Sequence, residues 1–157
     1  MRYILIGIGL VLLLFAAGCI ENSNSSTALQ LSGVEGKGEV VMYKSPYCGC
    51  CSDYKEYLES YGYSVKVIEL EEIESIKEKY SIPYSYRSCH TTIFGDYFVE
   101  GHVPIEAVDK LLSEKPRVDG IALPGMPAGS PGMPGVKRGV FRIFSITSGN
   151  AQLFDEI

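Results

Sequence analysis

The chain has 157 residues, of which 46% are hydrophobic and 21% are charged, and its formal net charge is −5. These values are ordinary for a globular protein and exclude a chain that is disordered throughout. The length suits one domain with a sizeable core. The acidic balance and the absence of a basic cluster in the sequence argue against nucleic acid as a partner.

The first eighteen residues differ in composition from the rest. Arg2 precedes an apolar run from Ile4 to Phe15, and Ala16-Ala17-Gly18 then leads to Cys19. The run is short for a transmembrane helix, which needs about 20 apolar residues, and small residues before a cysteine are typical of a lipoprotein signal segment. We therefore expect residues 1–18 to be a signal segment and Cys19 to carry a lipid, with an uncleaved anchor as the alternative.

Both alternatives attach the chain to a membrane and place the rest of it outside the cytoplasm, on the outer face of the cytoplasmic membrane or in the periplasm. Residues 19–38 are polar, rich in glycine and without periodicity, which predicts a flexible tether. The remaining residues, 39–157, are expected to form a thioredoxin-like metal-binding domain, for the reasons given below.

The first part of this domain alternates between strand and helix patterns. Val40 to Tyr43 predicts a buried strand, and apolar side chains recur at helical spacing from Ser52 to Tyr61. Tyr63 to Leu70 alternates as a second strand would. Glu71 to Tyr80 again has helical spacing, and its many acidic residues predict a solvated helix face.

A hairpin and a closing helix follow. Thr91 to Phe94 and Tyr97 to Glu100 flank Gly95-Asp96, which is a two-residue hairpin signal, and Pro104 is well placed in the first turn of a helix. Strand, helix, strand, helix, hairpin and helix in this order predict an α/β fold, a thioredoxin-like mixed sheet flanked by helices.

The composition changes after Pro116. A loop rich in glycine, proline and methionine runs from Leu123 to Gly135 and cannot form a regular helix or strand. Val140 to Ile146 and Ala151 to Phe154 predict a final β-hairpin.

Cys48 and Cys51 have the C-x-x-C spacing, between a predicted strand and a predicted helix, where a thioredoxin-like fold carries its redox pair. A helix N-terminus lowers the pKa of a thiol, so Cys48 is a candidate nucleophile and Cys51 a candidate resolving thiol. Cys50 adds a third thiol, which offers competing disulfides. Three thiolates within four residues suit a soft cation, Cu(I) or Zn(II). The alternative is one disulfide between Cys48 and Cys51, with Cys50 as a small buried residue.

Cys89 and His90 come just before the hairpin strand, in a loop that faces the start of the first helix in this topology. Cys89 is therefore a candidate fourth thiolate, the alternative being a second disulfide with Cys50. His90 and His102 are candidate ligands, although a histidine at the start of a helix, as His102 is, often serves as a cap.

Met126 and Met133 lie in the Gly/Pro-rich loop and not on a helical stripe. Thioethers bind Cu(I) and are poor ligands of Zn(II), so both are candidate copper ligands. The alternative is that they anchor the loop on the core. Three tyrosines, Tyr47, Tyr84 and Tyr86, are candidates for shielding the cysteines from water.

These residues resemble the CopG-type copper-resistance proteins, a thioredoxin-like family with a C-x-C-C cluster. The resemblance covers about Val40 to Phe154. The matching stretches are Tyr43-Lys44-Ser45-Pro46-Tyr47-Cys48-Gly49-Cys50-Cys51, Ser88-Cys89-His90-Thr91, Val99-Glu100-Gly101-His102-Val103-Pro104 and Pro124-Gly125-Met126-Pro127-Ala128-Gly129-Ser130-Pro131-Gly132-Met133. The lipoprotein-like leader and the insertion from Gly135 to Gly139 depart from the family pattern.

The resemblance implies an extracytoplasmic copper-resistance protein that holds a cysteine-bridged multinuclear copper cluster and interconverts Cu(I) and Cu(II). The expected partners are copper ions, the membrane and another copper-handling protein. The resemblance also implies that Cys48, Cys50, Cys51 and Cys89 are the cluster thiolates. His90, His102 and the two loop methionines would be further ligands or neighbours of ligands. Such a protein would be a copper oxidoreductase only if the cycling is catalytic.

The sequence is also compatible with two other functions. A metal-free thiol–disulfide oxidoreductase would need only Cys48 and Cys51. A structural zinc module would use three thiolates and one further ligand.

Overall fold

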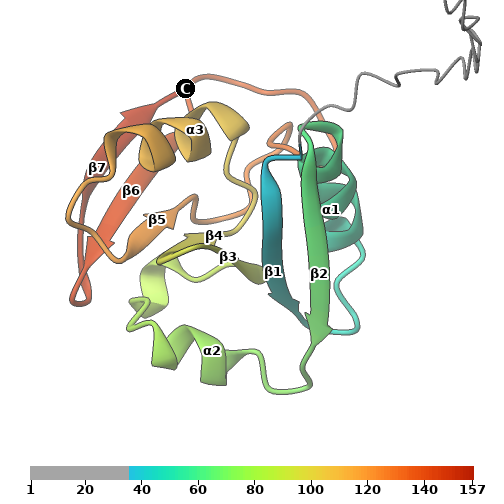
Figure 1. Ribbon diagram of the computed structural model, residues 1–157. Helices are drawn as coiled ribbons and strands as arrows, with labels where there is room; N and C mark the ends of the chain where they lie inside the picture. Colours follow the sequence, from blue (N-terminus) through green and yellow to red (C-terminus); the bar gives the residue numbers. More distant parts are fainter. Residues whose placement is uncertain (1–35) are drawn as a thin grey trace, which may run out of the picture. The chain divides into compact units, whose positions relative to one another are not determined.

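The computed structural model describes residues 36–157 (Figure 1). Its elements, in chain order, are β1 (Gly38–Lys44), α1 (Cys50–Ser60), β2 (Tyr63–Glu69), α2 (Glu74–Lys79), the 3₁₀ turn η1 (Tyr84–Tyr86), β3 (His90–Phe94), β4 (Tyr97–Glu100), α3 (Ile105–Glu114), β5 (Gly120–Ala122), β6 (Arg142–Thr147) and β7 (Asn150–Glu156).

The strands form one mixed sheet in the order β2-β1-β3-β4-β5-β6-β7. β1 pairs with β2 in parallel and with β3 antiparallel, β3 and β4 form the hairpin, and β5 lies parallel to β4. The last hairpin, β6 and β7, continues the sheet from β5. The predicted thioredoxin-like α/β fold with a C-terminal loop and hairpin is confirmed.

The two faces of the sheet bury different sets of side chains, because successive residues of a strand point to opposite faces. On one face, α1 and α3 contribute Tyr54, Leu58, Val108 and Leu111 to the main core cluster. On the other face, a smaller cluster includes Ile82 and Phe98, with Tyr80 and Tyr86 packed against it. Figure 1 shows α1 beside β1 and β2, and α2 apart from both α1 and α3.

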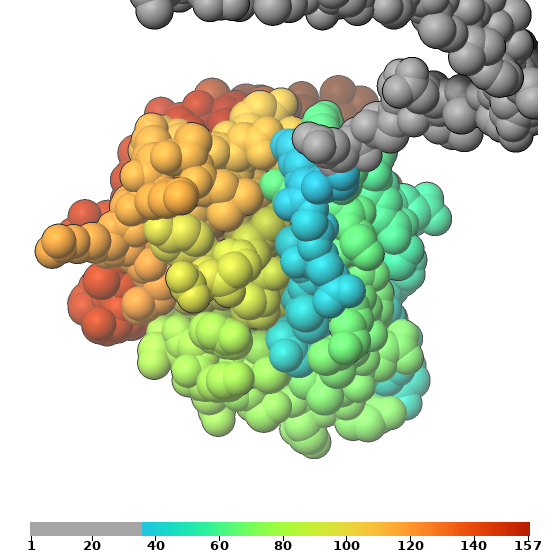
Figure 2. All heavy atoms as spheres, in the orientation of Figure 1, coloured from blue at the N-terminus to red at the C-terminus, as the bar shows by residue number. Residues whose placement is uncertain are grey.

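Two features of the fold differ from the sequence predictions. β5 was not predicted, because a three-residue strand is too short to show a period, yet it joins the final hairpin to the rest of the sheet. In Figure 2, orange residues of the α3–β5 region lie between the yellow hairpin residues and the red C-terminal residues, in agreement with this strand order. The second helix is shorter than expected, and the prediction of a solvated face is wrong for Lys77, which is completely buried.

No helix within residues 36–157 is both long and apolar enough to cross a membrane. The predicted signal segment at 1–18, the lipidation of Cys19 and most of the predicted tether at 19–38 lie outside the described residues.

The junction between β4 and β5 gives a test of the extended sheet. A Cβ atom at Gly120 would lie 2.5 Å from Cγ of Phe98 and would also meet the Phe98 carbonyl. We expect Gly120→Ala to lower the free energy of unfolding by about 1–3 kcal/mol, as overpacking of a core does. Urea unfolding of the metal-free protein measures it.

The matched control is Gly49→Ala, because no atom lies within 4 Å of a Cβ built there and the backbone of Gly49 is already helical. Its expected effect is within about 0.5 kcal/mol. Equal effects of the two substitutions would contradict the close approach of β4 and β5.

Candidate metal centre

The turn between β1 and α1 places three cysteines at the start of the helix. The N–H of Cys48 donates to the Ser45 carbonyl over 3.1 Å, and Gly49 then serves as the N-cap of α1, which begins at Cys50. Cys48 and Cys51 form a disulfide. The disulfide considered in the sequence analysis is therefore present, and it occupies the position of a thioredoxin-like redox pair.

Cys50 and Cys89 are free thiols. Their sulfur atoms lie 4.0 Å apart, and Cys50 Sγ lies 3.7 Å from Cys48 Sγ. Cys50 is only half-buried, so it is not the small buried residue of the alternative interpretation, and no second disulfide is formed among the described residues. As expected from the topology, Cys89 faces the start of α1.

His102 is held in the form that a metal ligand requires. Its Nδ1 lies 2.7 Å from the Pro131 carbonyl oxygen, and its Nε2 lies 3.1 Å from Cys89 Sγ. A carbonyl can only accept a hydrogen bond, so Nδ1 carries the hydrogen and the neutral ring leaves its Nε2 lone pair free. Burial lowers the pKa of His102, which favours this neutral ring. The sequence did not indicate the Pro131 contact, because any residue supplies a carbonyl.

His90 contributes a second buried imidazole. Its Nδ1 lies 3.3 Å from Cys89 Sγ, while its Nε2 is buried and has no hydrogen-bond partner among the described residues. Burial first, and then the neighbouring His102 and Lys77, hold the pKa of His90 well below its usual range. An unpartnered buried nitrogen on a neutral ring is costly in itself and is available as a ligand.

Tyr54 of α1 packs against both imidazoles. Its ring centroid lies 4.7 Å from that of His90 and 5.3 Å from that of His102, and its hydroxyl donates to the Val103 carbonyl over 2.8 Å. Tyr54 was predicted only as part of the apolar face of the helix. The prediction that tyrosines shield the cysteines from water is wrong for Tyr47 and Tyr84, because each is 85% exposed.

These side chains form two groups of candidate ligand atoms. Within each group, all the atoms lie within 4.8 Å of one another. One consists of four cysteines, and the other of Cys89 with the two histidines; the members are Cys48, Cys50, Cys51, Cys89, His90 and His102. Cys89 belongs to both groups. The structure therefore brings together all six of the predicted cysteine and histidine ligands.

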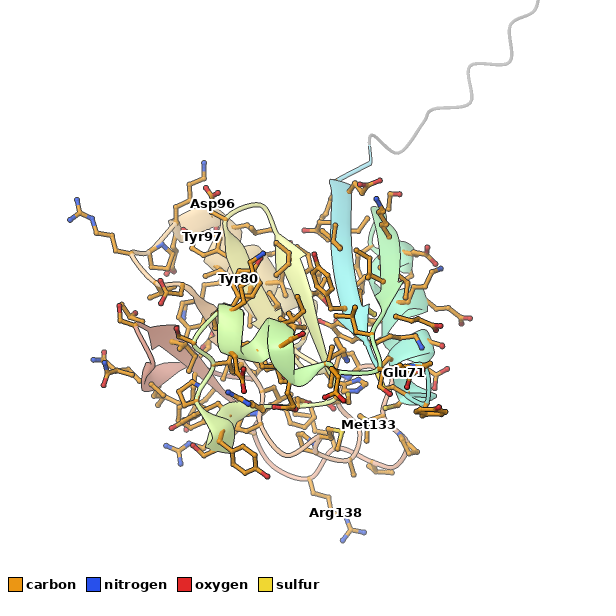
Figure 3. All side chains as sticks on the ribbon, turned by 90° about the horizontal axis from the view of Figure 1, so that it is seen from below. Glu71, Tyr80, Asp96, Tyr97, Met133 and Arg138 are labelled. Carbon is orange, nitrogen blue, oxygen red and sulfur yellow. A yellow bond between two sulfur atoms is a disulfide. The ribbon has the colours of Figure 1, made fainter. Side chains whose placement is uncertain are left out.

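The two predicted methionine ligands lie on the loop between β5 and β6. Met126 is 40% exposed and Met133 is half-buried. Asp96 marks the turn at which β3 ends, and Figure 3 shows Met133 far from it. Met133 therefore lies at the opposite end of the domain, where β3 begins. Their role as ligands stays a prediction.

The acidity of Cys89 can be tested on the metal-free protein. Burial, and secondly the neighbouring Cys50, raise the pKa of the Cys89 thiol to about 12. Since only the thiolate is alkylated, we expect iodoacetamide at pH 8 to modify Cys89 at least about tenfold more slowly in the folded protein than in urea. Peptide mass spectrometry measures the alkylation rate of Cys89, which in the folded protein should keep rising with pH up to about pH 12. Equal rates in the folded and unfolded protein would contradict the burial of this thiol.

Two family profiles match the chain in consecutive segments. The glutaredoxin family matches residues 40–87, and the family described as "Protein of unknown function, DUF411" matches residues 86–133. The first segment contains the C-x-C-C cluster, and the second contains Cys89, both histidines and both loop methionines. No curated protein matches the chain.

Two solved structures match over most of the domain. "Copper resistance protein copG- Form 2" is 36% identical, with a TM-score of 0.70, over 76% of this chain and 97% of that chain. "Copper resistance protein copG- Form 1" is also 36% identical, with a TM-score of 0.69, over 76% of this chain and 96% of that chain. At this identity and coverage, the chain belongs to the CopG family of copper-resistance proteins.

Proposed function

We propose that this protein binds copper for copper resistance or homeostasis, holding it on the cysteine cluster and the two histidines. The observation that carries the proposal is the convergence of three further sulfurs and two imidazoles on the sulfur of Cys89. The membership of the CopG family supports copper as the metal.

The donor set fits a soft cation. Sulfur ligands select Cu(I) and Zn(II), and imidazole suits copper and zinc. The pKa values of both histidines are lowered, chiefly by burial, so both rings are neutral, and each ring has a nitrogen close to Cys89 Sγ. Each of the six side chains therefore has a reason to be a ligand that does not depend on the family.

More than one copper ion fits this arrangement. The two ligand groups overlap only at Cys89, whose thiolate would bridge them. Sharing a sulfur lets a small number of thiolates hold several Cu(I) ions, as a multinuclear cluster requires.

The Cys48–Cys51 disulfide would control how many thiolates are available. A dithiol reductant that gives up two electrons and two protons would release both thiols to the cluster, and a disulfide that accepts them back would withdraw both thiols again. Copper would be retained in the reduced protein and released when the disulfide re-forms. The proposal includes cycling of bound copper between Cu(I) and Cu(II), which would make the protein a copper oxidoreductase if the cycle is catalytic.

A thiol–disulfide oxidoreductase is the second candidate. The disulfide at the start of α1 and the glutaredoxin match over residues 40–87 favour it. Such an enzyme would need Cys48 and Cys51 and would keep its activity with a chelator present and with Cys50 or Cys89 replaced. Reduction of insulin disulfides by dithiothreitol, followed with each of these variants, measures this activity.

Copper binding is tested on the full chain, purified in detergent without air and reduced. We expect more than one Cu(I) per chain, held against a competing chelator, with the ultraviolet charge transfer and luminescence of copper–thiolate. Cys89→Ser should lower the stoichiometry most, because both ligand groups use this sulfur. Cys50→Ser, which affects one group, should lower it less.

The oxidised wild-type protein is the matched control, because it has the same sequence and lacks the Cys48 and Cys51 thiols. It should bind less copper than the reduced form. Fewer than one tightly bound Cu(I) in the reduced protein, or no loss in either variant, would rule the proposal out. Tight binding of Zn(II) with no Cu(I) binding would instead favour the structural zinc module.

We also propose that residues 1–18 direct the chain out of the cytoplasm and that a lipid on Cys19, or an uncleaved anchor, tethers it to the membrane. The composition of this segment supports the proposal. The tether would hold the domain where another copper-handling protein can exchange copper with it.

Cell fractionation tests the anchor. If Cys19 is lipidated, Cys19→Ser should move the protein from the membrane fraction to the soluble fraction or leave the leader uncleaved, and metabolic labelling with a fatty acid should be lost. Ser23→Ala, four residues along the predicted tether, is the control. Retention of Cys19→Ser on the membrane without labelling of the wild type would indicate the uncleaved anchor.

A further inference from the structure

A completely buried ion pair lies behind the strand that follows Cys89. The Nζ atom of Lys77 is 2.6 Å from Oε1 of Glu100, and neither side chain has any exposed surface. Taking two charges out of water costs several kcal/mol per ion, and well-packed apolar residues of the same volume often stabilise a fold equally well or better. Stability alone therefore does not explain the pair, whereas its hydrogen bonds suggest a role.

The Glu100 carboxylate accepts hydrogen bonds from the residue before Cys89 and from the residue after His90. The backbone N–H of Ser88 donates to Oε1 over 2.5 Å, and the hydroxyl of Thr91 donates to Oε2 over 2.5 Å. Lys77 also donates to the Thr91 hydroxyl oxygen over 3.3 Å. Hydrogen bonds to an ionised group are roughly twice as strong as neutral ones. The carboxylate thus fixes the backbone before Cys89 and the side chain after His90.

The network lies on the face of the sheet opposite to the two histidines. Thr91 and Glu100 are directly opposite each other in the pairing of β3 with β4. Phe98, two residues before Glu100, belongs to the smaller core cluster, whereas His90 packs against Tyr54 of α1. Since side chains alternate along a strand, the network contacts this segment from behind.

The position of Cys89 is critical, because its sulfur belongs to both ligand groups. Cys89 precedes β3, which begins at His90, so the pairing of the strands does not by itself fix it. A metal site needs its ligands held within about 0.5 Å of the productive geometry. We propose that Lys77 and Glu100 are positioning residues that hold Cys89 against Cys50 and His102 before the metal binds, an inference that rests on the proposed metal-binding function.

The first test measures Cu(I) affinity on the full chain in detergent, reduced and without air. Lys77→Met combined with Glu100→Gln removes both charges and keeps the side-chain volume, so the protein should stay folded. We expect a loss of affinity of about 10- to 100-fold, as for other partners of metal ligands. Thr91→Val should also lower the affinity, and Thr91→Ser, which keeps the hydroxyl, should restore it.

The matched control removes an ion pair remote from the network. Lys110 Nζ and Asp155 Oδ2 lie 3.1 Å apart, on α3 and β7, and both side chains are partly exposed. Lys110→Met combined with Asp155→Asn should leave the Cu(I) affinity unchanged. Urea unfolding of every variant separates a loss of stability from a loss of affinity.

The second test uses the metal-free protein with its Cys48–Cys51 disulfide intact. A diazene oxidant, diamide, takes two electrons and two protons from Cys50 and Cys89 and joins their sulfurs, which start 4.0 Å apart. If the network positions Cys89, this reaction should be about 10- to 100-fold slower in the double variant and in Thr91→Val. Peptide mass spectrometry follows the new disulfide, and the Lys110/Asp155 control should react as the wild type does.

Variants that are less stable but bind Cu(I) and form the disulfide like the wild type would show a purely structural role and overturn the inference. If the wild type itself binds no Cu(I), the proposed function fails, and the disulfide rates alone decide whether the network positions Cys89. If the double variant does not fold, the comparison of Thr91→Val with Thr91→Ser decides.

Discussion

The contacts of the Cys89 sulfur are the interaction on which the centre depends. This atom lies 3.1 Å from Nε2 of His102, 3.3 Å from Nδ1 of His90 and 4.0 Å from the sulfur of Cys50. Three separate parts of the chain supply these partners: the start of α1, the start of β3 and the connection from β4 to α3. They meet because β1 and β3 are neighbours in the sheet, so the end of β1, which leads to α1, lies beside the beginning of β3. The order of the strands is thus what brings the candidate ligands together.

Under the proposed function, the same sulfur atoms would serve two kinds of chemistry, metal binding and disulfide formation, which exclude each other at any one moment. In the disulfide, Cys48 and Cys51 satisfy one another and have no thiolate to offer, while Cys50 and Cys89 stay free. The raised pKa of Cys89 means that its thiol loses a proton readily only when a cation replaces that proton. One disulfide and a protonated Cys89 thiol therefore agree with the proposal that the protein binds metal after reduction.

Much of this arrangement could be predicted from local patterns in the sequence. The cysteine spacing, the Gly95-Asp96 turn and Pro104 at the start of α3 each carry their own structural signal, and the order of the elements then determines which ends of the strands meet. The features that were not predicted depend on contacts between residues that are distant in the sequence. Lys77 belongs to a run of charged residues, and only the partner Glu100, on β4, explains why it is buried. β5 is too short to show a period and forms because β4 and β6 pair with it.

The Gly/Pro-rich loop shows why composition alone understates the role of a segment. Its Pro131 carbonyl determines which nitrogen of His102 carries the hydrogen, and so directs the free lone pair of that ring toward Cys89. The loop reaches this position by a close backbone approach: a Cβ atom at Gly132 would lie 2.6 Å from the backbone nitrogen of Tyr54, and its φ of +73° also favours glycine. Tyr54 in turn packs on both histidines. The residues that prevent this segment from forming a helix or strand are therefore the ones that let its backbone contact the centre, so the loop belongs to the site even if neither of its methionines binds copper.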